Sequence, residues 1–161
     1  MSSAEEKFNV AYDKYADMLY RIAFIYTGSC QESEDIVQEV FIKFLNKQLS
    51  FKDSDHEKAW LIRVTANKSK DYLKSSRHSN MPLNDEIIWG KNCDDDKRLD
   101  VQAGILSLDD KYKTIIYLYY YEDCSVNEIA SVLRLSKSAV KMRLSRAREQ
   151  LKSVLEEYCD G

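Results

Sequence analysis

The sequence contains few residues that interrupt helices. Its 161 residues include four glycines and one proline, Pro82, so few positions suit the tight turns that β-hairpins need. Hydrophobic residues make up 44% of the chain and charged residues 32%, a balance that supports a folded core. We therefore expect an all-α protein.

Metal-binding and membrane-spanning patterns are also missing. Four widely separated cysteines form no C-x-x-C pair, and with only two histidines there is no zinc-type ligand spacing. The longest apolar run, IIYLYYY at 115–121, is far shorter than the ~20 residues that span a bilayer. The N-terminus MSSAEEKF lacks the pattern of a signal peptide. These absences predict a cytoplasmic protein without metal or cofactor, whose cysteines stay reduced and have no function.

Apolar residues recur at helical spacing in two groups, separated by a polar stretch. Residues 78–97 contain Pro82 and many Ser, Asn and Asp residues, so they predict a flexible linker. The chain is thus expected to form two small helical domains, 1–77 and 98–161. In the first domain, helices are expected at about 5–27, from after the GSCQES segment (28–33) to Leu45, and at about 57–76. Four more are expected at about 95–106, 109–121, 126–133 and 137–157.

Positive charge is concentrated near the C-terminus of a chain whose formal net charge is −3. The segment LRLSKSAVKMRLSRARE at 133–149 follows a short helix that begins with Ser125 and Glu128 at capping-box spacing. The short turn RLS can end that helix, and its Ser136 can cap the next one. This layout predicts a helix-turn-helix.

The long helix of this motif has two different faces. Its apolar residues Val140, Leu144, Ala147, Leu151 and Val154 form one stripe, and the opposite face carries Ser138, Lys141, Met142, Ser145 and Arg146, with Arg143 and Arg148 at the margins. A solvated basic face on a surface helix is the simpler explanation. The capped turn, the opposed apolar stripe and the local charge together favour insertion into a DNA major groove, with other cations on phosphates.

A second basic stripe is predicted on the helix at 57–76. Its members at helical spacing are Arg63, Asn67, Lys70, Lys74 and Arg77. A solvated surface explains this stripe about as well as DNA binding does. Asn67 could hydrogen-bond a base edge, and Trp60 and Phe51 could stack on an unpaired base, although aromatic residues at helical spacing are more often part of a core.

Three segments together resemble one protein family. SEDIVQEVFIKFL, WLIRVTANKSKDYL and LSKSAVKMRLSRAREQL, in this order and at these separations, are similar to regions of the extracytoplasmic-function (ECF) group of bacterial sigma factors. The resemblance covers nearly the whole chain except the linker. It implies a promoter-specificity subunit of RNA polymerase that is not an enzyme and takes no small-molecule substrate.

The resemblance also implies a role for each domain. Domain 1–77 would be sigma region 2, which binds the polymerase clamp and the minus-10 element as single-stranded DNA. Domain 98–161 would be sigma region 4, which binds the double-stranded minus-35 element and the polymerase flap. The implied core polymerase-binding residues are Asp35, Gln38, Glu39 and Phe41. The implied minus-10 residues are Phe51, Trp60, Arg63, Asn67, Lys70, Lys74 and Arg77, and the minus-35 residues are Ser136, Lys137, Ser138, Lys141, Met142, Arg143, Ser145, Arg146 and Arg148.

Two departures from the family pattern leave the promoter sequence open. Ala66 stands where arginine is common in the family, and Met142 where a small polar residue is common. An anti-sigma factor, which could hold the protein at the inner face of the membrane, also stays open as a partner.

Two other functions are weaker alternatives. A stand-alone helix-turn-helix regulator would normally dimerise on two half-sites. An enzyme would need a metal site at Asp94, Asp95 and Asp96, but adjacent helical residues point in different directions and no histidine lies near them.

Overall fold

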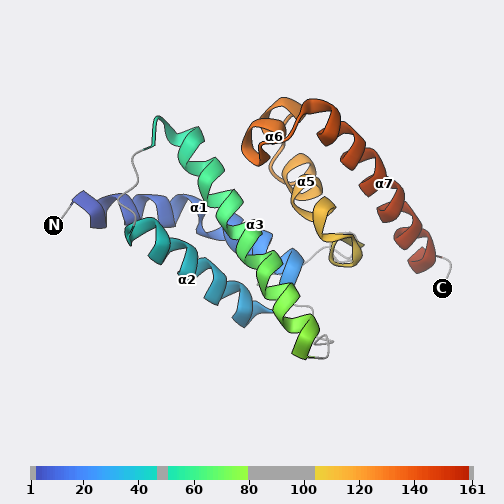
Figure 1. The fold of residues 1–161 in the computed structure, drawn as a ribbon, viewed down its shortest axis with the longest axis horizontal. Coiled ribbons are helices and arrows are strands. Elements are labelled where there is room, and N and C mark those ends of the chain that lie inside the picture. Colours follow the sequence, from blue (N-terminus) through green and yellow to red (C-terminus); the bar gives the residue numbers. More distant parts are fainter. Residues whose placement is uncertain (1–2, 47–50, 80–103, 160–161) are drawn as a thin grey trace. The chain divides into compact units, whose positions relative to one another are not determined.

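The structure, a computed structural model, describes residues 3–46, 51–79 and 104–159. These residues are helices joined by short turns, without a strand among them (Figure 1). The chain divides into two compact units, Met1–Met81 and Pro82–Gly161. The expected all-α class is confirmed.

The first unit consists of three helices that pack against one another (Figure 1). They are α1 (Ser3–Thr27), α2 (Cys30–Asn46) and α3 (Ser54–Ser79). Their apolar faces meet in a core whose fully buried members include Leu19, Ile22, Phe24, Ile25, Val40, Leu61 and Ile62. Two buried hydroxyl groups on α3 are satisfied within the helix, since Thr65 donates to the carbonyl of Leu61 at 2.8 Å and Ser69 to that of Thr65 at 2.7 Å.

The second and third helices begin earlier than the sequence predicts. Ser29 caps α2, because its hydroxyl accepts from the Glu32 N–H at 3.3 Å and its carbonyl accepts from the Ser33 N–H at 3.0 Å. Asp53 caps α3 in the same way, since its carboxylate accepts from the His56 N–H at 2.8 Å. Because of these caps, polar residues that the sequence predicts as loop form the first turn of each helix.

The third helix also ends later than predicted. It continues to Ser79, so His78 and Ser79 belong to the helix and not to the predicted linker. The first helix breaker after Arg77 is Pro82, and nothing before it prevents helical hydrogen bonding. The remainder of the predicted linker and most of the predicted helix at 95–106 lie outside the described residues; 104–107 are helical.

The second unit is built on α5 (Asp110–Tyr120), α6 (Val126–Leu133) and α7 (Lys137–Cys159). Each of these helices contacts the other two. Their core includes Ile105, Ile115, Ile116, Tyr117, Leu118, Ile129, Val140, Leu144 and Ala147, all at most 2% exposed. Three members of the predicted apolar stripe of α7 are therefore buried as expected.

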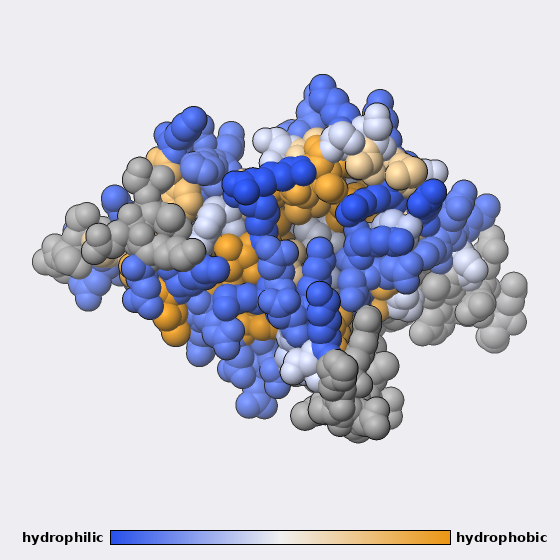
Figure 2. Space-filling model, in the orientation of Figure 1, coloured by the Kyte–Doolittle hydropathy of each residue, from blue (hydrophilic) through white to orange (hydrophobic). Residues whose placement is uncertain are grey.

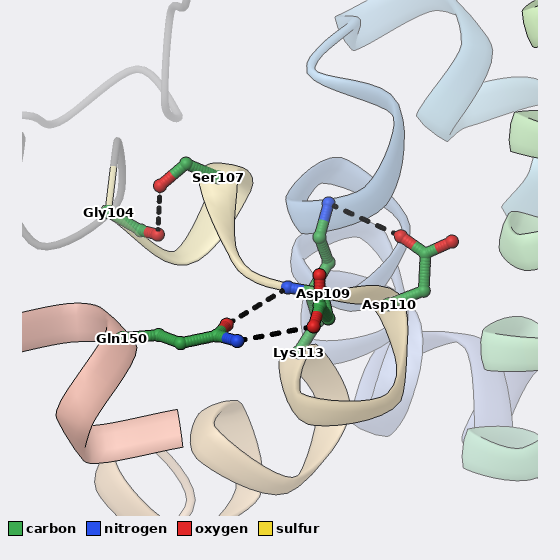
Figure 3. Close-up of polar contacts among 6 residues, drawn as sticks. All are labelled: Gly104, Ser107, Asp109, Asp110, Lys113 and Gln150. Carbon is green, nitrogen blue, oxygen red and sulfur yellow. Dashed lines mark hydrogen bonds and ion pairs between the residues drawn. The ribbon is translucent and has the colours of Figure 1, made fainter. Parts of the chain in front are cut away.

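Polar side chains join the start of α5 to the middle of α7 (Figure 3). Gln150 accepts from the Asp109 N–H at 3.4 Å and donates to the Asp109 carboxylate at 3.2 Å. Nearby, the buried ammonium of Lys113 lies 4.0 Å from the carboxylate of Asp110. Asp109 thereby uses its side chain to tether α7 and not to cap its own helix.

The turn between α6 and α7 has the geometry of a helix-turn-helix. Arg134 adopts the left-handed conformation (φ 56°, ψ 46°) and ends α6, at a cost of about 1 kcal/mol for a residue with a side chain. The Leu135 N–H then bonds the Ala130 carbonyl at 3.0 Å, and the Ser136 hydroxyl accepts from the Ala139 N–H at 3.0 Å. The predicted role of Ser136 as a helix cap is confirmed.

The described residues include neither a membrane-spanning helix nor a paired cysteine. Within them, no helix combines the length and hydrophobicity needed to cross a membrane. Cys30 and Cys124 are free thiols.

The cap of α6 gives a stability prediction. Ser125 accepts from the Glu128 N–H at 3.1 Å and donates to the Glu128 carboxylate at 3.2 Å. Ser125→Ala should therefore lower the free energy of unfolding of the α5–α7 unit by about 1 kcal/mol. Hydrogen exchange of the α6 amides in increasing urea measures this change. The control Ser131→Ala, an exposed change in the same helix, should alter it by less than about 0.5 kcal/mol; equal effects would contradict a capping role.

Candidate nucleic-acid interface

The exposed face of α7 carries most of the side chains predicted for minus-35 recognition. Lys137, Ser138, Lys141, Met142, Ser145 and Arg146 are all exposed, with Met142 at 49%. Burial of Val140, Leu144 and Ala147 on the other side fixes this face toward solvent. The arrangement offers three long cations, two hydroxyl groups and one apolar side chain within three helical turns, a set that can contact base edges and phosphates.

The two arginines at the margins of this face have different surroundings. Arg143 is half-buried, whereas Arg148 is exposed. The Nε of Arg148 donates to the Tyr120 hydroxyl at 2.8 Å, and its guanidinium lies 5.1 Å from the ring centroid of Tyr119. This hydrogen bond raises the pKa of Arg148 above its usual value, while partial burial opposes the shift. Arg148 is thus already engaged with α5, a contact that the sequence pattern did not reveal.

The predicted basic stripe on α3 also lies at the surface. Asn67 and Lys74 are exposed, and Arg63 and Lys70 are half-buried; the side chain of Arg77 lies outside the described residues. Hydrophilic residues cover much of the visible face of α3 (Figure 2). On the opposite side of the helix Leu61, Ile62, Thr65 and Ala66 are buried, whereas Tyr72 and Leu73 are half-buried.

Phe51 and Trp60 belong to an aromatic cluster at the N-terminal end of α3. Phe51 stacks on Phe44 with centroids 6.0 Å apart and planes at 11°. Trp60 lies 5.9 Å from Phe51 and 6.3 Å from Phe44, and His56 lies edge-on to Phe51 at 5.3 Å. Both predicted base-stacking residues are half-buried, so each is part of a packed cluster and still has exposed surface.

Asn67 lies two turns along α3 from this cluster. Trp60 and Asn67 are seven positions apart and so share one strip of the helix, with a separation of about 10.5 Å along its axis. The strip therefore begins with aromatic rings and continues with amide and ammonium groups. This order suits an unpaired base, which can stack on the rings, and the phosphate backbone that follows it.

The four residues of α2 that were predicted to bind polymerase differ in their exposure. Asp35, Gln38 and Glu39 are exposed, whereas Phe41 is 2% exposed. Phe41 packs against Phe8 and Tyr12 of α1, with centroid distances of 5.6 and 5.1 Å. Phe41 therefore supports the fold from inside, and only the three polar residues are accessible to a partner.

The exposed surface of α2 also includes two apolar residues that the sequence analysis missed. Ile42 is 56% exposed and Leu45 is 40% exposed. They lie four and seven positions beyond Gln38, so all three share one strip of the helix. The apolar pattern of the helix includes Leu45 as a core residue and does not single out Ile42; only the position of the buried face on Ile36, Val37 and Val40 shows that both are exposed.

Glu39 is connected to α3 by an ion pair. Its carboxylate lies 3.5 Å from the ammonium of Lys68, and the two side chains are 63% and 30% exposed. Ion pairs this accessible contribute little stability, so Glu39 can exchange Lys68 for a charge on a partner at small cost.

A metal site has no support in this region. Among the described residues, no group of three or more His, Cys, Asp or Glu side chains could hold an ion. The aspartates at 94–96, considered in the sequence as a metal site, lie outside the described residues.

Two protein-family models match the chain, one in each unit. Sigma-70 region 2 matches residues 11–79, and Sigma-70, region 4 matches residues 98–151. The first match contains the exposed strips of α2 and α3. The second contains the exposed face of α7.

The chain is also similar to curated sigma factors over most of its length. The chain is 27% identical to the ECF RNA polymerase sigma factor SigW of Bacillus subtilis, over 94% of this chain and 90% of that protein. It is 31% identical to the RNA polymerase sigma factor SigV of the same species, over 80% of this chain and 78% of that protein.

Two solved structures share the fold. The sigma factor RpoE in complex with the anti-sigma factor NepR from Bartonella quintana matches with a TM-score of 0.76 and 20% identity, over 94% of this chain and 98% of that chain. CnrH in complex with the cytosolic domain of CnrY matches with a TM-score of 0.71 and 24% identity, over 95% and 90%.

Proposed function

Since the chain belongs to the ECF group of RNA polymerase sigma factors, we propose that its three exposed helix surfaces divide the work of promoter recognition. The protein binds core RNA polymerase and directs promoter-specific initiation of transcription. The observation that carries the proposed division is the presence of a polar or basic helix face in each unit, inside the residues that match sigma regions 2 and 4.

Polymerase binding is assigned to α2. Asp35, Gln38 and Glu39 supply polar contacts, and the adjacent Ile42 and Leu45 supply apolar area, a mixture typical of protein interfaces. The acidic members suit a basic partner surface.

Minus-35 recognition is assigned to the exposed face of α7. Lys141, Ser145 and Arg146 would meet base edges in the major groove, and Met142 would contact an apolar base edge such as a thymine methyl. The flanking Lys137, Ser138 and Arg143 would hold phosphates, and Ser136 would set the start of the helix.

Minus-10 recognition is assigned to α3 and to Phe51, three positions before its first residue. Phe51 and Trp60 would stack on an unpaired base, and Asn67 would hydrogen-bond to a base edge. Arg63, Lys70, Lys74 and Arg77 would follow the backbone of the same strand.

The domain limits follow this division: 1–77, extended to Ser79 by the end of α3, as sigma region 2, and 98–161 as sigma region 4, with the segment between them as a linker. The protein would act in the cytoplasm without catalysing a reaction. The two structural neighbours are described as complexes with anti-sigma factors or a cytosolic partner domain, which supports an anti-sigma factor as a further partner.

The assignment of α2 is tested by a double change. Gln38→Ala with Glu39→Ala should weaken binding to core RNA polymerase at least about tenfold, because two polar contacts are lost at the centre of the interface. Fluorescence titration with core enzyme measures the affinity. Asp17→Ala removes an exposed carboxylate from α1 and should bind like the unchanged protein. Unaltered binding of the double variant would exclude this surface of α2.

The assignment of α7 is tested by separating base contacts from phosphate contacts. Lys141→Ala or Arg146→Ala should cost about 1–3 kcal/mol at the preferred minus-35 element if the side chain reads a guanine, and should relax the preference at one position only. Arg143→Ala should weaken all sequences alike and reduce the salt dependence. Holoenzyme binding to a panel of single-base promoter variants measures both effects. Uniform losses for all three variants would mean that α7 holds phosphates alone.

The assignment of α3 is tested by strand opening. Phe51→Ala and Asn67→Ala should impair open-complex formation more than closed-complex binding, because stacking on a base supplies about 1–3 kcal/mol toward its extrusion. A premelted template should partly rescue Phe51→Ala, whereas Lys70→Ala should stay weak on both templates. Permanganate footprinting of the promoter bubble measures opening. Normal bubbles with both Phe51→Ala and Asn67→Ala would place melting elsewhere.

A further inference from the structure

Arg148 lies in a corner formed by two tyrosine rings at the end of α5. The rings of Tyr119 and Tyr120 have centroids 5.0 Å apart and planes at 76°. The guanidinium carbon of Arg148 lies 5.1 Å from the Tyr119 centroid and 5.8 Å from that of Tyr120. A planar cation at these distances is attracted to both rings.

A hydrogen bond fixes the orientation of the same side chain. The Nε of Arg148 donates to the Tyr120 hydroxyl at 2.8 Å, across 28 positions of sequence. A hydrogen bond with an ionised donor is stronger than one between neutral groups. Three interactions thus join one side chain of α7 to the last turn of α5.

This contact ties the recognition helix to the segment that leads into the helix-turn-helix. Tyr120 is the last residue of α5, and α6 begins a few residues later at Val126. Arg148 lies one turn beyond the buried Leu144 and directly after the buried Ala147. The DNA-facing half of α7 is therefore held by the turn from α6 and by its buried apolar stripe, and Arg148 adds a further contact to α5 beyond them.

We propose that Arg148 is a positioning residue that holds α7 against Tyr119 and Tyr120, and that it is not a phosphate ligand. This inference rests on the proposed role of α7 in minus-35 binding. It removes Arg148 from the set of DNA contacts that the charge pattern suggested. It also assigns a function to the aromatic pair at the end of α5, in which Tyr119 is half-buried and Tyr120 is 50% exposed.

A phosphate ligand and a positioning residue respond differently to salt. Each phosphate contact contributes about 0.9 to the slope of log affinity against log salt concentration. Loss of a positioning residue lowers affinity but leaves the number of ionic contacts unchanged. The slope consequently separates the two roles where affinity alone cannot.

The first experiment measures the affinity of the holoenzyme for a duplex promoter, selected from a randomised library, at several salt concentrations. Arg148→Ala should lower affinity about threefold to tenfold with an unchanged slope, whereas Arg143→Ala should reduce the slope by about 0.9. Lys152→Ala, which removes an exposed cation one turn further along α7, should change neither. A slope reduced by about 0.9 in Arg148→Ala, or an unchanged affinity, would overturn the proposal.

The second experiment tests the partner of Arg148. Tyr120→Phe keeps the ring and removes the hydroxyl that accepts the hydrogen bond. It should lower affinity less than Arg148→Ala does, and it should cause little further loss when combined with Arg148→Ala. Additive losses in the double variant would show that the two residues act independently and would contradict the proposal.

The third experiment needs no DNA or polymerase. Hydrogen exchange of the full chain should be faster at residues 137–146 in Arg148→Ala than in the unchanged protein, because α7 is held less firmly. Unchanged exchange in this segment would overturn the proposal. If the unchanged holoenzyme failed to bind promoters, the proposed function would be wrong, and this measurement would still decide whether Arg148 holds α7.

Discussion

Burial of one apolar stripe on α7 determines which side chains of this helix face solvent. Val140, Leu144 and Ala147 are almost completely removed from water, and rotating the helix would expose them at a cost of a few kcal/mol. Because this rotation is fixed, Lys141, Ser145 and Arg146 must lie on the opposite side. All three side chains are exposed, so the sequence of this face can change with little effect on the fold.

The same constraint operates in the first unit, where it acts on two helices at once. Burial of Val37 and Val40 presents Gln38 on α2, and burial of Leu61 and Ile62 presents Asn67 on α3. An ion pair between Glu39 and Lys68 joins these two helices, and both side chains are accessible to water. Affinity for a partner can therefore change on either helix with little effect on stability.

Periodicity predicted the helices and their buried faces, because apolar spacing directly reflects burial. It failed at helix starts, where Ser29 and Asp53 act through hydrogen bonds that depend on backbone geometry. The family resemblance, and not periodicity, gave the buried Phe41 a role in polymerase binding, and neither of them revealed the partners of Arg148. The contacts of Phe41 with Phe8 and Tyr12 of α1 and those of Arg148 with two tyrosines of α5 join residues 28 or more positions apart, and no local pattern encodes such pairs. Ile42 and Leu45 were missed because an exposed apolar residue resembles a core residue until the neighbouring helices are in place.

The central claim is that two separate helical units read two promoter elements for one polymerase. Transcription by core RNA polymerase with this protein, on a template library randomised upstream of the start site, tests it most directly. The account predicts that sequencing the transcribed templates reveals two different elements at a fixed spacing, both dependent on added core enzyme. Enrichment of a palindrome of two equal half-sites, bound equally well without polymerase, would contradict the account and indicate a dimeric helix-turn-helix regulator.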